Sequence, residues 1–317
     1  MKRVLVTGGF GYLGGRIAVE LVRDPKFIVR LGSRKNQPVP QWLPKAEIVK
    51  LDVLDLDSLQ KAMADVQAVV HLAAMNESEC LVDPGKAILI NTLGTWNVLQ
   101  AAIKSQVERF IYFSTAHVYG APLVGHISEN TLPRPIHPYA ITHHAAEDHV
   151  LAAHDQKKII GIVLRLSNGF GAPIHTNIDR WTLLVNDLCC QLVQTGQMVL
   201  KSSGLQQRDF IPLEDVARAV RYFLRLTRVQ CEDGLFNLGA GLSLSVWEMA
   251  QRIKNRCQSI LGFSPLIICA KPSKSEAEGT ELVYSIGKLK KSGFLLNGNL
   301  DVEVDNLLRL CRNFKEV

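Results

Sequence analysis

The sequence lacks the features of a secreted or membrane-spanning chain. Its seven cysteines are scattered and form no Cys-x-x-Cys pair, and such an odd, unpatterned set favours reduced thiols in a cytosolic protein. No apolar run approaches the roughly 20 residues that a membrane-spanning helix needs, and Met1 is followed directly by a strand-like segment instead of a signal peptide. We therefore expect a cytoplasmic protein without a membrane partner.

The sequence also lacks a strong excess of charge of one sign. Its net charge is +6 over 317 residues, and the basic residues are spread along the chain rather than gathered in blocks. This distribution is typical of a solvated surface, so we expect no nucleic-acid partner. Seven of the nine histidines lie between residues 117 and 154, but no pair of them is accompanied by a carboxylate at ligand spacing, and we expect no metal site.

Internal repeats are absent, and the first half of the chain instead alternates strand-like with helix-like segments. The strand-like runs are apolar almost throughout and cover residues 3–8, 27–34, 46–53, 68–74, 109–115 and 159–168. Leu13, Ile17 and Leu21 recur at helical spacing after the first of them. Apolar strands separated by amphipathic helices predict an α/β fold with a doubly wound parallel sheet of the Rossmann type, covered on both faces.

The pattern loosens in the second half of the chain, where glycine and proline punctuate shorter elements. We expect residues 1–167 to form a dinucleotide-binding domain, to which segments near 209–240 return. Residues 168–317 would form mainly a smaller α/β lobe that binds the substrate. Ligands of doubly wound folds bind beyond the carboxyl ends of the strands, so the second lobe would close over that edge of the sheet.

A glycine-rich turn follows the first strand-like run. Gly8, Gly11 and Gly14 stand in the sequence TGGFGYLG, between a strand and a helix, which is the setting that a dinucleotide motif requires. The glycines permit a tight turn, a close approach of a pyrophosphate, and close packing of helix on strand. The pyrophosphate would lie at the helix N-terminus, where free N–H groups favour anions. The alternative is a glycine turn with a structural role alone.

The end of the second strand-like run indicates which nucleotide fits. An acidic residue there accepts from a ribose 2′-hydroxyl, but the chain has Ser33 and Arg34 and no carboxylate. The guanidinium of Arg34 can pair with a 2′-phosphate, which favours NADP as the cofactor, with NAD as the alternative; Arg34 would otherwise be a solvated loop residue. Asp52, after the third strand-like run, would accept from the adenine amino group or cap a turn.

Further motifs follow the glycine turn along most of the chain: LDVLD, VVHLAA, NTLGTWNVLQAA, FIYFSTAHVYG, HPYAITHH, LRLSNGFGAP and RDFIPLEDVARA. Together they resemble the extended short-chain dehydrogenase/reductase family, the group of NAD(P)-dependent nucleotide-sugar epimerases and dehydratases. The resemblance is specific for fold and cofactor, but not for the reaction. With the residues discussed above, it implies cofactor contacts at Gly8, Gly11, Tyr12, Leu13, Gly14, Ser33, Arg34, Asp52, Val53, Leu72, Ala73, Ala74, Ser114, Tyr139 and His143.

The resemblance also implies a catalytic constellation. Tyr139 would act as general acid/base at a substrate hydroxyl or carbonyl, and Thr115 would hydrogen-bond the same oxygen while the nicotinamide ring takes or gives a hydride. Tyrosine has an ordinary pKa near 10, so it needs stabilisation of its anion to act as a base near pH 7. The family supplies a lysine four residues later, whereas this chain has His143 there.

His143 shares a helix face with Tyr139 and can hydrogen-bond a ribose hydroxyl. Imidazole is shorter than lysine and has a reference pKa near 6.5, so we expect weaker, pH-dependent activation of Tyr139. A protonated tyrosine suits a reductase, which needs a proton donor. Alternatively, His143 is a surface residue of a protein that binds the cofactor without catalysis.

On the substrate side, the resemblance implies a nucleotide sugar. Asn168 and Arg208 match family residues that contact the diphosphate, although Arg208 would alternatively pair with Asp209. A third family arginine is missing, and Lys271 is the nearest candidate. The carboxylates that many dehydratases place beside the threonine are also missing, because Ala116 and His117 stand there, which disfavours a 4,6-dehydratase.

We therefore expect an NADP-dependent oxidoreductase or epimerase that acts on a nucleotide-activated sugar. The alternatives are a catalytically impaired NADP(H)-binding sensor or partner protein, and a reductase of a non-sugar carbonyl. The resemblance further implies a homodimer formed by the helices that carry NTLGTWNVLQAA and Tyr139, with Trp96, Ala145 and Ala146 as contact residues.

Overall fold

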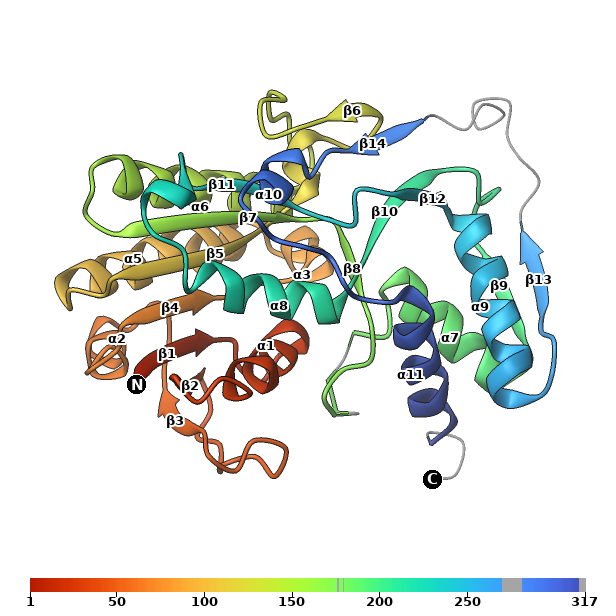
Figure 1. Cartoon of the computed structure of the whole chain (residues 1–317), viewed down its shortest axis with the longest axis horizontal. Coiled ribbons are helices and arrows are strands. Elements are labelled where there is room, and N and C mark those ends of the chain that lie inside the picture. Colours follow the sequence, from red (N-terminus) through yellow and green to blue (C-terminus); the bar gives the residue numbers. More distant parts are fainter. Residues whose placement is uncertain (176, 179, 270–280, 314–317) are drawn as a thin grey trace.

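The computed structural model describes residues 1–175, 177–178, 180–269 and 281–313. A seven-stranded sheet forms its centre, with all neighbours parallel, in the order β11-β7-β5-β4-β1-β2-β3 (Figure 1). The strands are β1 (Lys2–Thr7), β2 (Phe27–Ser33), β3 (Glu47–Lys50), β4 (Ala68–His71), β5 (Arg109–Thr115), β7 (Ile160–Leu166) and β11 (Leu235–Leu238). The predicted doubly wound parallel sheet is confirmed.

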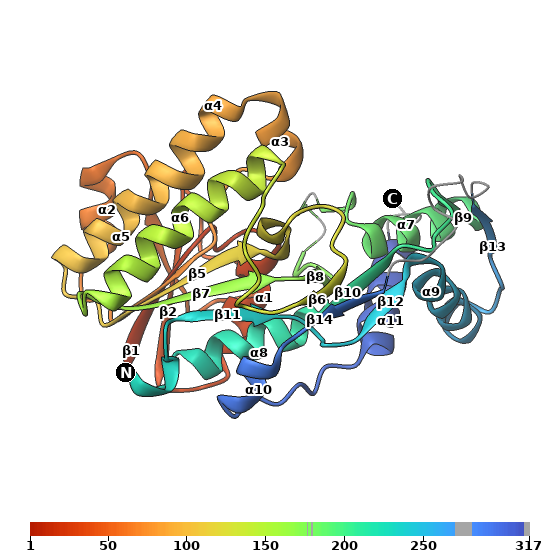
Figure 2. The same cartoon turned by 90° about the horizontal axis from the view of Figure 1, so that it is seen from above.

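Helices cover both faces of this sheet (Figure 2). Val4 and Val6 of β1 belong to the core beneath α1 and α8, whereas Leu5 between them belongs to the core on the other face, beneath α2, α5 and α6. This alternation follows from the two-residue period of a strand. The helices are α1 (Tyr12–Val22), α8 (Leu213–Phe223), α2 (Leu56–Ala62), α5 (Gly94–Lys104) and α6 (Pro138–Asp155). No helix in the described ranges combines the length and apolarity needed to cross a membrane.

The helical segment before β5 has several parts. α3 (Glu77–Val82) is followed by α4 (Pro84–Ala87), a π-helical turn (Ile88–Leu93) and then α5. At the start of α5, Gly94 packs against Val53, whose side chain would lie 2.6 Å from a Cβ atom at this position. The start of α5 therefore lies close against the loop that follows β3.

The smaller lobe is built around three helices that share one core: α7 (Leu184–Thr195), α9 (Val246–Leu261) and α11 (Leu300–Arg312). Short strands complete it or connect it to the central sheet. They are β8 (Asn168–Phe170), β10 (Gln207–Pro212) and β12 (Ser243–Ser245) in one sheet, β9 (Gln197–Leu200) with β13 (Leu266–Cys269), and β6 (Gly125–Ile127) with β14 (Leu282–Tyr284).

The chain returns to the central sheet after it has begun the smaller lobe. α8 packs on α1, and β11 pairs with β7 at the edge of the sheet. Tyr284 of β14 is buried, and its hydroxyl donates to the carbonyl oxygen of Arg165 at 2.7 Å. α10 (Gly287–Lys291) lies next to β11. The lobes are consequently joined by several crossings of the chain.

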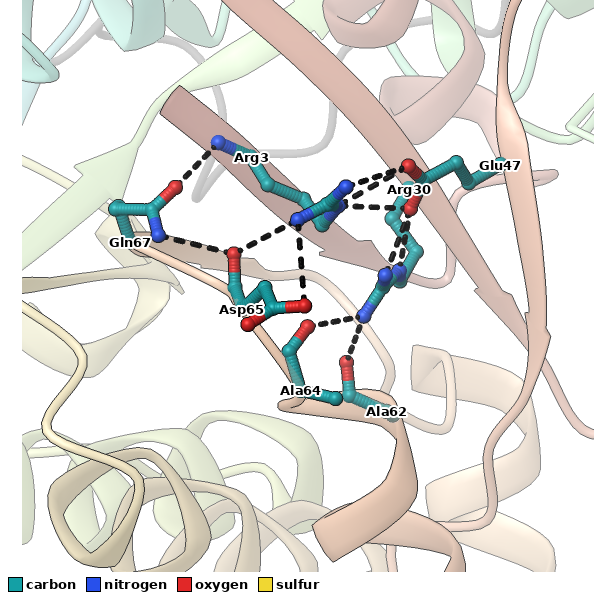
Figure 3. Close-up of polar contacts among 7 residues, drawn as sticks. All are labelled: Arg3, Arg30, Glu47, Ala62, Ala64, Asp65 and Gln67. Atoms are coloured by element: carbon teal, nitrogen blue, oxygen red, sulfur yellow. Dashed lines mark hydrogen bonds and ion pairs between the residues drawn. The ribbon is translucent and has the colours of Figure 1, made fainter. Parts of the chain in front are cut away.

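A cluster of charged side chains connects the three neighbouring strands β1, β2 and β3 at one edge of the central sheet (Figure 3). The guanidinium groups of Arg3 and Arg30 converge on the carboxylate of Glu47, with nitrogen–oxygen distances between 2.7 and 3.1 Å. Arg30 also donates to the carbonyl oxygens of Ala62, the last residue of α2, and Ala64, just beyond it, at 2.9 and 2.7 Å. One carboxylate thus pairs with two guanidinium groups.

We predict that Glu47→Gln, which keeps the shape of the side chain but removes its charge, lowers the free energy of unfolding by about 1 kcal/mol at pH 7. Its hydrogen bonds with Arg3 hold the pKa of Glu47 below its usual value. A carboxyl group of this kind contributes stability above its unfolded-state pKa and loses it as the pH falls through the folded-state pKa. The difference should therefore shrink in acid, as measured by urea unfolding over a range of pH.

The matched control is Glu108→Gln, since Glu108 pairs with Lys2 at 2.7 Å between side chains that are more than half exposed. An isolated, exposed pair should contribute close to nothing. Equal losses for the two variants, or a Glu47→Gln effect that does not change with pH, would contradict this account.

Candidate active site

A cleft of about 1700 Å³ opens at the carboxyl ends of the central strands, between them and the first elements of the smaller lobe. It brings together most of the residues predicted from the sequence. Those that line it are Gly8, Gly11, Tyr12, Leu13, Gly14, Ser33, Arg34, Val53, Leu72, Ala73, Ala74, Ser114, Thr115, Tyr139, His143, Asn168 and Arg208. Lys271 lies outside the described residues.

The glycine turn forms the part of the cleft between β1 and α1. Gly8 has φ +65°, and a Cβ atom on Gly14 would lie 2.3 Å from the carbonyl oxygen of Gly8 and 2.8 Å from the Cα of Gly9. α1 begins after Gly11 without a side-chain cap and has no acidic residue in its first turn. Its first N–H groups therefore remain available for an anion.

Of the two residues expected to contact the adenosine end of the cofactor, Arg34 lines the cleft and Asp52 does not. Arg34 is exposed, lines the cleft and forms no ion pair within the described part of the chain. Asp52 is the exception among the predicted cofactor contacts, because it does not line the cleft. Its carboxylate accepts the N–H of Leu54 at 3.0 Å, and so caps a turn, while Leu51 and Val53 on either side face the cleft.

The residues of the predicted catalytic constellation lie together in the cleft. Thr115 ends β5, and Tyr139 and His143 stand one turn apart near the start of α6, with ring centroids 4.3 Å apart. α6 begins here because Pro138 occupies its first turn and Nδ1 of His137 accepts the N–H of Tyr139 at 3.1 Å.

Burial determines the protonation of both α6 side chains. It raises the pKa of Tyr139 well above the usual value; the carboxylate of Glu77 adds to this shift, and the guanidinium of Arg180 opposes it. Burial lowers the pKa of His143 to about 4. The imidazole is thus neutral near pH 7, and the pH-dependent charge expected from its reference pKa near 6.5 is absent.

Two polar atoms in the cleft have no hydrogen-bond partner within the described residues. They are Oγ of Ser114 and Nε2 of His143, both buried. Leaving such an atom unpaired costs roughly 1–3 kcal/mol. A ligand that carries hydroxyl or amide groups would satisfy both, so the residues present fit the ribose–nicotinamide end of a dinucleotide.

The substrate side of the cleft carries Asn168 and Arg208. The amide of Asn168 donates to the carbonyl oxygen of Asp209 at 3.0 Å. The expected alternative pairing of Arg208 with Asp209 is not found, because the Asp209 carboxylate instead accepts from Ser167 at 2.5 Å and from the N–H groups of Ala240 and Gly241 at 2.8 and 2.7 Å. Arg208 forms no ion pair among the described residues and faces the cleft.

The residues of this region that were not predicted as site residues include three that act on Tyr139 or His143. Glu77 and Arg180 line the cleft and act electrostatically on Tyr139, but neither belongs to a motif with fixed spacing to it. Tyr112 contacts His143 from β5; its position three residues before Thr115 was the available indication. No group of three or more potential metal ligands occurs within the described ranges.

The sequence profile of the NAD dependent epimerase/dehydratase family matches residues 4–239, and the chain belongs to this family as an enzyme. It is 28% identical over 276 residues to a putative UDP-glucose 4-epimerase of Methanocaldococcus jannaschii, covering 86% of this chain and 87% of that protein. It is 28% identical over 267 residues to human dTDP-D-glucose 4,6-dehydratase, covering 80% and 72%.

A solved structure of similar fold is the UDP-glucose 4-epimerase of Thermotoga maritima with UDP-glucose. It superimposes with a TM-score of 0.81 at 20% identity and covers 99% of both chains. At this identity the likeness shows the fold.

We predict that Gly14→Ala weakens dinucleotide binding at least tenfold, because the added methyl group would overlap the backbone of Gly8 and Gly9 and force the turn apart. Fluorescence titration with NADPH measures the effect. The matched control is Gly15→Ala, whose Cβ would lie 3.2 Å from the Cβ of Ile174, a much milder approach than the 2.3 Å at Gly14. Unchanged affinity in Gly14→Ala would show that the turn does not hold the ligand.

Proposed function

We propose that this enzyme is an NADP-dependent oxidoreductase or epimerase that acts on a nucleotide-activated sugar by hydride transfer, with Tyr139 as general acid/base. One observation carries the proposal. A single cleft joins the uncapped glycine turn, the trio of Thr115, Tyr139 and His143, and the unpaired guanidinium of Arg208. These are sites for a pyrophosphate, a reacting oxygen and a second phosphate-bearing ligand.

The choice of NADP rests on Arg34. Its exposed guanidinium stands at the end of β2, where a carboxylate would accept from a 2′-hydroxyl. The guanidinium group is planar and permanently charged, so it can donate two parallel hydrogen bonds to a 2′-phosphate. When bound, the nicotinamide ring would supply or accept the hydride.

Proton transfer falls to Tyr139. Because burial raises its pKa, the phenol keeps its hydrogen near pH 7 and can donate it to a substrate oxygen. Oγ1 of Thr115 accepts the N–H of His117 at 3.2 Å, so its own hydrogen remains free to donate to the same oxygen. This arrangement favours the reductive direction. In the oxidative direction, the cation of Arg180 and the charge of an oxidised nicotinamide ring would lower the pKa of Tyr139.

His143 takes over one of the two tasks of the family's lysine. His143 lines the cleft, and its buried Nε2, which has no hydrogen-bond partner within the described residues, can hydrogen-bond a ribose hydroxyl. Since its ring is neutral, it supplies no fixed positive charge to Tyr139. In this chain, His143 would therefore position the cofactor without activating Tyr139 electrostatically.

We further propose a homodimer. α5 and α6 lie side by side on one face of the molecule (Figure 2), and both contact the π-helical turn before α5. These segments expose large apolar side chains. These are Ile88, Leu89, Leu93, Trp96 and Ile141. Ala146, expected as a contact residue, is fully buried in the core and cannot belong to such an interface.

We predict that Arg34→Ala lowers the affinity for NADPH about tenfold or more, which is the scale of a charge-assisted hydrogen-bonded pair, while the affinity for NADH changes less than about twofold. Paired fluorescence titrations measure this. Lys35→Ala, one residue further along the same exposed loop, serves as the control. Tighter binding of NADH than of NADPH by the wild-type protein would refute the choice of NADP.

We predict that Tyr139→Phe reduces hydride transfer by roughly 100-fold or more with a panel of UDP- and dTDP-sugars, because the proton donor is lost, while NADPH binding persists. Tyr222→Phe is the control, since the Tyr222 hydroxyl donates to the carbonyl oxygen of Ser292 and does not line the cleft. Intact cofactor binding without exchange from any of these sugars in the wild-type protein would instead support a sensor role.

A further inference from the structure

Tyr112 and His143 form a closely matched pair between β5 and α6. The Tyr112 hydroxyl lies 2.7 Å from Nδ1 of His143, and the two rings are 25° from parallel with centroids 5.7 Å apart. The side chains are 2% and 3% exposed. A hydrogen bond and a ring contact made from the same neighbour fix the orientation of the imidazole, so its two nitrogens cannot exchange places.

The second ring nitrogen of His143, Nε2, is not hydrogen-bonded to Tyr112. It is buried, belongs to a residue that lines the cleft, and has no hydrogen-bond partner within the described residues. A hydroxyl group both donates and accepts, so a ligand hydroxyl can pair with Nε2 in either tautomer of the neutral ring.

Tyr112 itself stands behind the cleft and does not line it. Its other side faces His71, with ring centroids 5.9 Å apart and planes at 26°. Nδ1 of His71 lies 2.7 Å from Oγ1 of Thr7, and its Nε2 lies 3.0 Å from Oγ1 of Thr95. A row of three rings thus runs from β4 through β5 to α6, with both outer rings held by hydrogen bonds.

We propose that Tyr112 is a positioning residue, which holds Nδ1 of His143 so that Nε2 faces a ligand hydroxyl in the cleft. Under the proposed function, on which this inference rests, that hydroxyl belongs to the nicotinamide ribose. Tyr112 and His143 then act as a unit. Tyr112 is required because the imidazole of His143 must be held in one orientation. A lysine at position 143, with its flexible side chain, would not need the Tyr112 hydroxyl.

Tyr112→Phe is the direct test, because it removes only the hydroxyl and keeps the ring in the row. We expect NADPH affinity of the full chain to fall about tenfold, and the ¹⁵N NMR signal of Nδ1 of His143 in the ligand-free protein to shift because this nitrogen loses its hydrogen-bond partner. In the wild-type protein, NADPH should shift the Nε2 signal. An unchanged Nδ1 signal and affinity in Tyr112→Phe, or an Nε2 signal that does not respond to NADPH, would overturn the proposal.

A double-mutant cycle separates positioning from mere structural support. In a His143→Lys background, Tyr112→Phe should change NADPH affinity less than about twofold; a tenfold loss in both backgrounds would overturn the proposal. Tyr119→Phe is the matched control, since this buried hydroxyl donates to Asn237 at 2.7 Å. It should lower thermal stability without shifting the Nδ1 signal of His143. Failure of the proposed function would appear separately, as absence of NADPH binding to the wild-type protein.

Discussion

The hydroxyl of Thr7 accepts the backbone N–H groups of Leu72 and Ala73 at 3.0 and 3.2 Å, and it lies 2.7 Å from Nδ1 of His71. Because it accepts twice, its single hydrogen must go to His71, whose Nε2–H then faces Thr95. The ends of β1 and β4 are joined at the point where the chain enters the glycine turn. This one hydroxyl therefore connects the glycine turn to Leu72 and Ala73, which line the cleft, and to His71, the first ring of the row.

Tyr139 and His143 carry no charge themselves near pH 7. Burial lowers the pKa of His143 to about 4 and keeps Tyr139 protonated, and it lowers the pKa of His71, behind the cleft, to about 3. Charged groups line the same cleft: Glu77 and Arg180 act on Tyr139, while Arg34 and Arg208 form no ion pair within the described residues. Neutral donors are thus available for the reacting oxygen, and cations for the phosphates of a ligand.

Local patterns in the sequence predicted the strands and the glycine turn, because apolar runs and backbone sterics act over a few residues. The pattern TGGFGYLG and the spacing between Tyr139 and His143 were informative for the same reason. The lowered pKa of His143 was not predictable, since it depends on burial by segments far away in the chain. The engagement of Asp209 by residues 240 and 241 likewise depends on tertiary contacts, whereas the turn cap at Asp52 is local and was one of the two alternatives for this residue.

The late return of the chain to the central sheet has a consequence for its biosynthesis. β7 ends at Leu166, but β11, which covers its open edge, begins only about 70 residues later, at Leu235. At 5–20 residues per second, ribosomes need roughly 4–14 s to make that stretch. During this interval the nascent sheet exposes a row of unpaired backbone groups, the kind of edge on which strands of other chains add. Protection of that edge, by speed of translation or by a chaperone, is thus part of what this topology requires of the cell.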